Sequence, residues 1–170
     1  MKRAIWNLIL LCCIGIRAEA ADGATKETAM NEKLNALFSG SALRLAKTLS
    51  ETNSIMANGF DSKANDAEKP VFAITIARFA TEAEASSFFK KSVMVRMVAG
   101  AKETKAGFDE AYRWPGRAFV GRSDVWVLNI TRVPNSETKL AADFVADSFA
   151  RNRRQKPELL DELVPHVKNK

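Results

Sequence analysis

The chain has 170 residues, 46% of them hydrophobic and 27% charged, which suits one folded domain with its own hydrophobic core. A single histidine and two cysteines leave little material for histidine- or thiolate-based catalysis and metal binding. The formal net charge of +6 is mildly basic, and the chain lacks the dense basic block of a dedicated nucleic-acid binder.

The first twenty residues have the pattern of an export signal. Lys2 and Arg3 precede an apolar run from Ile5 to Ile16, and Ala18-Glu19-Ala20 places small residues where a signal peptidase reads them. We therefore expect residues 1–20 to be a signal peptide that is cleaved after Ala20. The apolar run is shorter than the roughly 20 residues that span a bilayer, so a retained N-terminal anchor is the less favoured alternative.

Cleavage would remove both cysteines and leave residues 21–170 without a disulfide or a thiolate metal site. Cys12 follows Leu11, whereas lipid attachment requires a small residue before the cysteine, so we expect no lipidation. Without the three basic residues and the one acidic residue of the leader, the 26 basic and 20 acidic residues become 23 and 19, a net charge of +4. Such a chain suits the bacterial periplasm, or secretion from a bacterium, with no transmembrane segment after cleavage.

Residues 21–69 are predicted to be a helical segment followed by a loop. Between Glu27 and Glu51, apolar residues recur at spacings of three and four, the pattern of an amphipathic helix. Ser39-Gly40-Ser41 interrupts the pattern, and we expect two helices in a near-continuous rod rather than one helix with an internal glycine. Thr52 to Lys69 is rich in Asn, Asp, Gly, Ser and Pro and is predicted to be a loop at the boundary with a core domain.

A strand and a helix are predicted to open that core domain. Large and small residues alternate from Pro70 to Ala80, which indicates a strand. Thr81 and Glu84 form a capping box, and the helix that they start is expected to end near Gly100. Val93 to Val98 also alternates like a strand, but we expect it to be helical because no turn residue separates it from the capped start.

Residues 109–133 contain the clearest hairpin signal and are predicted to be the centre of the sheet. Ala111 to Trp114 is expected to be a short strand. Two further strands, Arg117 to Gly121 and Asp124 to Val133, are expected to join through a tight turn around residues 121–124. The large apolar residues of the last strand share one face: Trp126, Leu128 and Ile130.

A final amphipathic helix is expected after a turn at Pro134 to Glu137, with Ser136 or Thr138 as its cap. Its apolar stripe comprises Leu140, Ala141, Phe144, Val145, Ser148, Phe149 and Asn152. Residues 153–170 are predicted to be a basic, partly helical tail. The elements predict an α+β fold in which helices cover one face of a three- to five-stranded antiparallel sheet, within residues 70–152, preceded by the N-terminal helical segment.

Most catalytic chemistries lack their residues or motifs in this chain. The single histidine, His166, lies in the terminal tail, and no phosphate-binding loop, dinucleotide fingerprint or zinc-protease motif occurs. Two carboxylate pairs remain, Asp109 with Glu110 and Asp143 with Asp147. The first pair is expected to point apart and the second to lie on a solvated helix face. We expect no enzyme activity, no cofactor and no metal site.

A mixture of arginine and aromatic side chains is the one site-like feature. Aromatic side chains on a sheet with flanking arginines can stack on and neutralise an anionic ligand. The simpler interpretation is that Phe119 and Trp126 belong to the core, while the arginine stems lie along apolar surface. Trp114, beside a Pro-Gly turn, is expected at the rim of the sheet. The predicted ligand or partner patch comprises Tyr112, Arg113, Trp114, Arg117, Arg122 and Trp126.

The runs FDEAYRW and GRSDVWVLNITR, followed by a Leu/Ala-rich helix, resemble small extracytoplasmic domains of bacterial lipoproteins and receptor-kinase sensors. The resemblance covers Val71 to Arg151 and is one of layout. A strand and a crossover helix lead to an acidic-Ala-aromatic entry and then to a strand that begins with Arg, a variable residue and Asn or Asp. This chain lacks the usable lipid-attachment cysteine and the disulfides of many such domains. The resemblance implies binding or sensing in the envelope.

The sequence therefore predicts an exported bacterial envelope domain that binds an envelope protein or a small anionic ligand, without catalysis and without nucleic acid. Two alternatives stay open. A structural subunit of an envelope assembly would expose a large apolar patch on the isolated domain. A small carboxylate- and arginine-dependent hydrolase would bring Asp109 or Glu110 within hydrogen-bond reach of Arg113 or Arg117 in a concave pocket.

Overall fold

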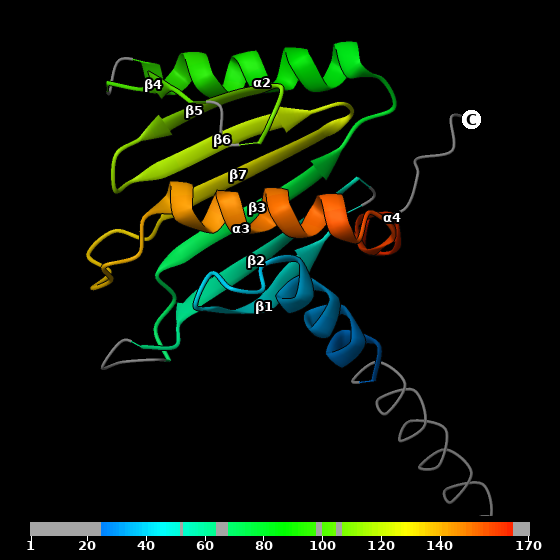
Figure 1. The fold of residues 1–170 in the computed structure, drawn as a ribbon, viewed down its shortest axis with the longest axis vertical. Helices are drawn as coiled ribbons and strands as arrows, with labels where there is room; N and C mark the ends of the chain where they lie inside the picture. The colour runs from blue at the N-terminus through cyan, green and yellow to red at the C-terminus, as the bar shows by residue number, and fades with distance from the viewer. Residues whose placement is uncertain (1–24, 52, 64–67, 98–99, 105–106, 165–170) are drawn as a thin grey trace, which may run out of the picture.

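The structure, a computed structural model, describes residues 25–51, 53–63, 68–97, 100–104 and 107–164 (Figure 1). The expected signal peptide, Val98 and His166 lie outside the described residues. Within those residues, no helix is both long and apolar enough to cross a membrane. The elements are a helix over residues 25–37, β1 (Leu43–Ser50), β2 (Ser54–Asp61), β3 (Phe72–Arg78), α2 (Glu82–Met97), β4 (Lys102–Glu103), β5 (Glu110–Trp114), β6 (Ala118–Ser123), β7 (Trp126–Arg132), α3 (Ala142–Gln155) and α4 (Glu158–Leu163).

All seven strands form one antiparallel sheet in the order β1-β2-β3-β7-β6-β5-β4. Two antiparallel meanders, β1 to β3 and β4 to β7, meet where β3 pairs with β7. Helix α2 carries the chain from the middle of the sheet to its far edge (Figure 1). The α+β class is as predicted, but the prediction of three to five strands is wrong.

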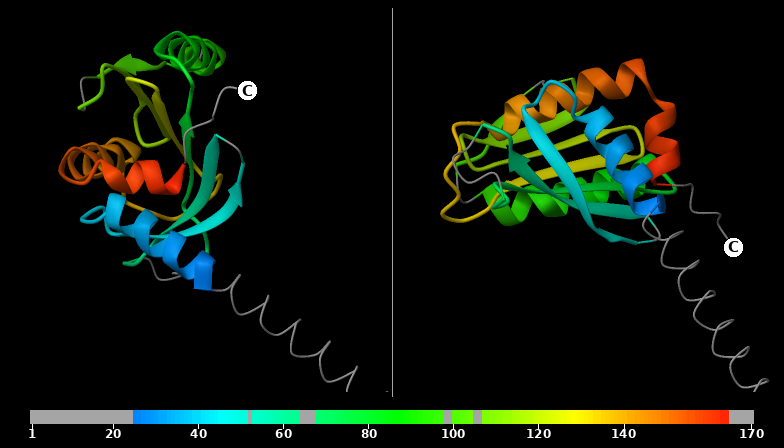
Figure 2. Two further views of the ribbon diagram at one scale, coloured as in Figure 1. Left: turned by 90° about the vertical axis from the view of Figure 1, so that its right-hand side faces the viewer. Right: turned by 90° about the horizontal axis from the view of Figure 1, so that it is seen from below.

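Helices cover both faces of the sheet, whereas the sequence predicted one covered face. The N-terminal helix, α3 and α4 lie on one side (Figure 2), and α2 packs over β6 and β7 on the other. Alternate residues of these two strands enter different cores: Phe119 and Leu128 the larger one, Val120 and Val127 the one beneath α2. A strand that is apolar on both faces is expected to be buried on both. The continuous apolar runs of β6 and β7 therefore explain why α2 covers the second face of the sheet.

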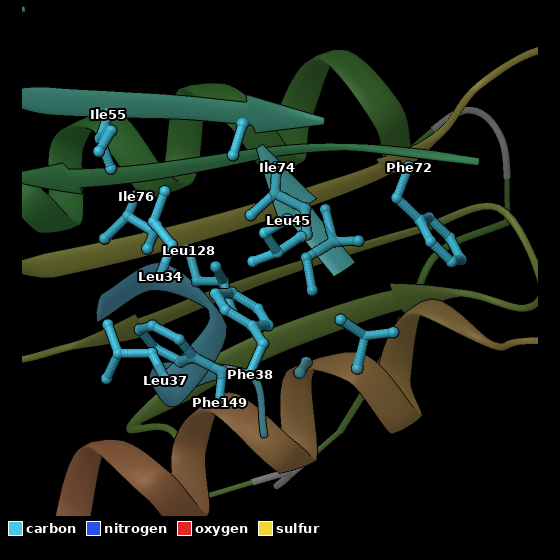
Figure 3. Close-up of a cluster of buried hydrophobic side chains, with 14 of the residues drawn as sticks. Leu34, Leu37, Phe38, Leu45, Ile55, Phe72, Ile74, Ile76, Leu128 and Phe149 are labelled. Carbon is cyan, nitrogen blue, oxygen red and sulfur yellow. The ribbon is translucent and has the colours of Figure 1, made fainter. Parts of the chain in front are cut away.

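The larger core joins the N-terminal region to the C-terminal helices. Leu34, Leu37 and Phe38 are at most 1% exposed and meet Phe149 of α3 between that helix and the strands (Figure 3). Leu160 of α4 belongs to the same core. Residues near both ends of the described chain therefore stabilise the same core, the larger of the two.

The prediction of a second helix within residues 27–51 is wrong, because β1 occupies Leu43–Ser50. Residues 38–42 reverse the chain, with both Gly40 and Ala42 at positive φ. The reversed chain then pairs along its length with β2. Apolar residues at spacings of three and four suit a helix, but this tertiary pairing overrides the local preference.

The prediction of a loop over residues 52–69 is also wrong, because β2 occupies Ser54–Asp61. The Asn58-Gly59 pair suggests a turn but lies inside this strand. A Cβ atom at Gly59 would lie 3.2 Å from Leu43 Cδ1 and 3.3 Å from Leu45 Cδ2. The glycine therefore makes room for two leucines of β1, which is a packing role rather than a turn role.

The strand predicted at residues 70–80 is confirmed by β3, and the helix that follows begins as expected. The Glu84 N–H donates to Thr81 Oγ1 at 3.2 Å. Glu84 Oε2 in turn accepts from the Ala80 N–H at 3.1 Å, so both side chains satisfy backbone donors at the helix start. The helix continues to Met97, which confirms the helical interpretation of residues 93–97.

The predicted hairpin is present, but its turn lies two residues later than expected. β6 extends through Ser123, which pairs with Trp126, and Asp124 has a φ of 51° in the turn between them. Gly121 is not a turn residue. A Cβ atom there would lie 2.7 Å from ring atoms of Phe108, so the glycine lets that ring cover β6.

The final helix starts later than predicted. α3 begins at Ala142, and Ala141 precedes it without a side-chain cap. The expected cap, Thr138, instead donates its hydroxyl to Asp61 Oδ2 at 2.6 Å. The buried face also differs from the predicted stripe, since Phe144 is 48% exposed. The buried residues of α3 are Ala142, Val145, Ala146, Ser148, Phe149 and Ala150.

Candidate functional site

The six residues of the predicted patch do not form one surface. Trp114 and Arg117 line the same pocket at one end of the β5–β6 hairpin. Tyr112 packs with the core beneath α2. Arg113 reaches α3, where its Nη1 donates to Asp143 Oδ2 at 2.8 Å. Neighbouring residues of a strand point to opposite faces, so Arg113 is separated from Tyr112 and Trp114.

The remaining two patch residues lie at the opposite end of the hairpin. Arg122 Nε donates to Glu110 Oε2 at 2.8 Å, and its Nη1 lies 3.8 Å from Asp109 Oδ2. Trp126 packs against the larger core, with the guanidinium carbon of Arg78 4.8 Å from its ring centroid. These arginines are committed to groups of the protein itself.

The pocket that Trp114 and Arg117 share, here the Trp114 pocket, has a volume of about 730 Å³. It lies between the turn after β5 and the loop after β7. It is lined by Trp114, Gly116, Arg117, Ala118, Thr131, Arg132, Val133, Pro134, Asn135, Ser136, Glu137 and Thr138. Trp114 is 4% exposed, so it forms a fixed wall, whereas Arg117 is exposed. The combination offers an apolar surface with a cation at its margin.

The turn at residues 115–117 places Arg117 at this margin. Gly116 has a φ of 67°, a conformation that glycine adopts without strain. The Arg117 N–H donates to the Trp114 C=O at 2.9 Å, which closes the turn. Among the described residues, no carboxylate lies within ion-pair distance of Arg117. Because Arg117 is exposed and lines the pocket, its guanidinium is accessible to a ligand there.

Arg132 joins the two walls of the pocket. Its Nη1 donates to the Gly116 C=O at 3.1 Å, and its Nη2 donates to the Thr138 C=O. Ser136 Oγ donates to the Val71 C=O at 3.3 Å on the other side of the loop. The 133–141 loop is therefore held to β5–β6 through Arg132 and to the start of β3 through Ser136, which gives the pocket a fixed shape.

The carboxylates considered for catalysis do not meet the arginines that a hydrolase would require. Asp109 and Glu110 lie beside Arg122, and Asp143 pairs with Arg113. No group of three or more His, Cys, Asp or Glu that could hold a metal ion occurs in the described part of the chain. In the described residues, these carboxylates are therefore paired with Arg113 and Arg122 and lie outside the lining of the Trp114 pocket.

Asp147 gives a pH-dependent prediction. Asp147 is an exposed residue, but partial burial of its carboxyl raises its pKa above the ordinary 3.8, Asp143 adds to the rise, and Arg151 opposes it. Well below pH 3.8, Asp147 is protonated in both the folded and the unfolded chain and has no effect on stability. Above pH 3.8, the Asp147 carboxyl ionises more readily in the unfolded chain, so it lowers the free energy of unfolding as the pH rises. We expect Asp147→Asn to raise the free energy of unfolding at pH 7 by at most about 0.5 kcal/mol, since the side chain is exposed.

Thermal unfolding at pH 7 and pH 3 tests this expectation. The gain from Asp147→Asn should disappear at pH 3. The control, Asp143→Asn, removes the ion pair with Arg113 and should give no gain at pH 7. A gain from Asp147→Asn that is equal at both pH values would contradict the assignment to ionisation.

Sequence reasoning missed Arg132 and the 133–141 loop as parts of the site. Arg132 stands at the end of β7 directly before this loop, a position where a strand delivers side chains to a sheet edge. That position was the available signal. The loop itself is held by Asp61 and Val71, which bond Thr138 and Ser136 and are far from them in the sequence, so no local pattern predicts its position.

Comparisons with protein-family models, with curated proteins and with solved structures found no match to this chain.

Proposed function

We propose that this protein is an exported, non-catalytic binding domain of the bacterial envelope, and that the Trp114 pocket takes a small organic anion. The observation that carries the proposal is the exposed Arg117, without a carboxylate partner among the described residues, at the margin of a pocket walled by Trp114. A volume of about 730 Å³ lies within the range of small-molecule sites, roughly 300–1,000 Å³.

The chemistry of the walls suits an anion attached to an apolar body. Val133 and Pro134 offer most of the apolar surface, since Trp114 and Ala118 belong to the core beneath α2 and are only slightly exposed. Arg117 can donate two hydrogen bonds to a carboxylate, sulfonate or phosphate. Arg132 cannot do the same freely, because two backbone carbonyls already occupy its Nη atoms. Export is supported by the leader, and the absence of catalysis by the engagement of the carboxylates with other arginines.

The alternative of a structural envelope subunit has less support. The exposed large apolar side chains of the described residues come from four elements: Leu49, Met56, Phe88, Met94 and Phe144. Of these, Leu49 and Met56 pair across β1 and β2. One such pair is smaller than the patch expected of a subunit that is incomplete alone.

A pair of fluorescent probes tests the proposed function. 1-Anilinonaphthalene-8-sulfonate carries an anionic group on an aromatic body, and N-phenyl-1-naphthylamine has nearly the same body without the charge. We expect Arg117→Gln to weaken binding of the sulfonate about fivefold to tenfold, because a charge-assisted hydrogen bond at a partly exposed site contributes about 1–1.5 kcal/mol. Binding of the uncharged probe should stay within about twofold.

Arg113→Gln is the matched control, because Arg113 is also exposed but faces Asp143 outside the pocket. The protein is expressed with its own leader and purified from the envelope fraction, and circular dichroism verifies that each variant is folded. Equal effects of the two substitutions on the sulfonate, or equal loss of both probes in Arg117→Gln, would show that Arg117 does not recognise the anion.

A further inference from the structure

A second pocket lies on the other side of the 133–141 loop. This Lys139 pocket also has a volume of about 730 Å³. Its lining includes Lys63, Lys69 and Lys139, together with Asp61 and Val71. Residues 135–138 line both pockets, so this part of the loop forms a ridge between them.

The charges around the ridge are unbalanced. Among the described residues, three lysines line the Lys139 pocket and two arginines line the Trp114 pocket, whereas Asp61 and Glu137 are the carboxylates in these linings. The described lining residues thus carry three more cations than carboxylates, on the two sides of residues 135–138. Cations lined along a concave surface concentrate anions and attract those with several charges most strongly.

The buried carboxylate of this region serves the loop rather than a ligand. Asp61 is 6% exposed, and its two oxygens accept hydrogen bonds from Thr138 Oγ1 at 2.6 Å and from the Lys63 N–H at 2.9 Å. Thr138 Oγ1 also accepts from the Leu140 N–H at 3.1 Å. The ridge is thus held from both sides, by Asp61 here and by Arg132 in the Trp114 pocket. A ligand that reaches both pockets must pass over the ridge.

We propose that the two pockets form one extended site for a linear phosphate polymer that carries no nucleobases. Arg117 binds one end, and Lys63 and Lys139 bind a segment on the far side of the ridge. This inference rests on the proposed function of the Trp114 pocket and names its ligand class. Lysine supplies point charges that tolerate many phosphate orientations, which suits a flexible chain. Two linked contacts raise affinity well beyond either contact alone.

Isothermal titration calorimetry at constant ionic strength tests the proposal. The probes are orthophosphate, tripolyphosphate and long-chain polyphosphate, each compared per phosphate group. The long chain is expected to bind at least about tenfold more tightly per phosphate than orthophosphate, because its linked groups occupy both pockets. Equal affinity per phosphate for all three lengths would overturn the extended site.

A double substitution separates the extended site from general charge attraction. Lys63→Gln with Lys139→Gln should weaken long-chain polyphosphate at least about tenfold and leave 1-anilinonaphthalene-8-sulfonate within about twofold. Lys90→Gln with Lys91→Gln removes the same charge from exposed positions of α2, away from the pocket linings. It should change polyphosphate affinity by less than about twofold. Equal losses in the two double variants would overturn the proposal.

The test distinguishes failure of this inference from failure of the proposed function. Arg117-dependent binding of the sulfonate without a length effect keeps the Trp114 pocket and overturns the extended site. Lysine-dependent binding of polyphosphate that Arg117→Gln leaves unchanged overturns the joined site, and only the loss of Arg117-dependent sulfonate binding overturns the anion role of the Trp114 pocket. A glycerol phosphate polymer and single-stranded DNA identify the source of the phosphates, and tighter binding of the DNA would overturn the proposal.

Discussion

Replacing Phe149 with alanine is expected to lower the free energy of unfolding by about 3–5 kcal/mol, the usual cost of removing a buried aromatic ring. Phe149 is 1% exposed. Its ring centroid lies 5.1 Å from that of Phe38 and 6.3 Å from that of Phe108. The ring therefore connects α3 with the end of the N-terminal helix and with the segment before β5, and its loss leaves a cavity where all three meet.

Urea denaturation followed by circular dichroism measures this change. Phe144→Ala is the matched control, because Phe144 lies on the same helix but is 48% exposed, and it should cost less than about 1 kcal/mol. If Phe149→Ala does not fold, Phe149→Leu provides a smaller loss of volume for the same comparison. Similar costs for the substitutions at 144 and 149 would contradict the burial of α3 described here.

The sequence predicted elements whose signals are local. The capping box of Thr81 and Glu84 and the apolar alternation of residues 70–80 depend on neighbours within a few residues, and the structure contains both the helix and the strand. The sequence failed at residues 43–61, where the elements depend on distant partners. Spacings of three and four near Leu45, and an Asn-Gly pair at 58–59, have local meanings that tertiary pairing overrides.

The candidate site was also predictable only where its signals are local. Trp114 beside its Pro-Gly turn and Arg117 in the same turn were recognisable from sequence, and the structure places both on one pocket. The predicted strand began at Arg117, but β6 begins at Ala118, so Arg117 lies in the turn and is exposed while Phe119 is buried. The opposite wall could not be predicted, because the 133–141 loop is positioned by Asp61 and Val71 from the other half of the sheet.

Replacing Asn35 with alanine is expected to lower the free energy of unfolding by about 2–4 kcal/mol and to promote self-association. β1 is an edge of the sheet, and strand edges carry unpaired backbone groups that attract other strands. Asn35 satisfies two of them: its Oδ1 accepts from the Leu45 N–H at 2.8 Å, and its Nδ2 donates to the Leu45 C=O at 2.9 Å. The side-chain amide thus occupies the place of a neighbouring strand.

Two graded variants test this role of the amide. Asn31 satisfies one further edge group, the Lys47 N–H at 2.8 Å, so Asn31→Ala should cost about half as much as Asn35→Ala. Asn35→Asp keeps the acceptor but replaces the donor with a carboxylate oxygen facing the Leu45 C=O and the Asn31 C=O, so at pH 7 it should cost at least as much as Asn35→Ala.

Size-exclusion chromatography with light scattering, over a range of protein concentrations, reports the second effect. The unchanged protein should keep its mass across that range, whereas Asn35→Ala should increase in mass as the open edge of β1 pairs with another copy. Phe149→Ala provides the comparison, because it lowers stability by a similar amount without removing an edge contact. Association of both variants to the same extent would assign the effect to partial unfolding. Association of Asn35→Ala alone would establish that the Asn35 side-chain amide protects the edge of the sheet.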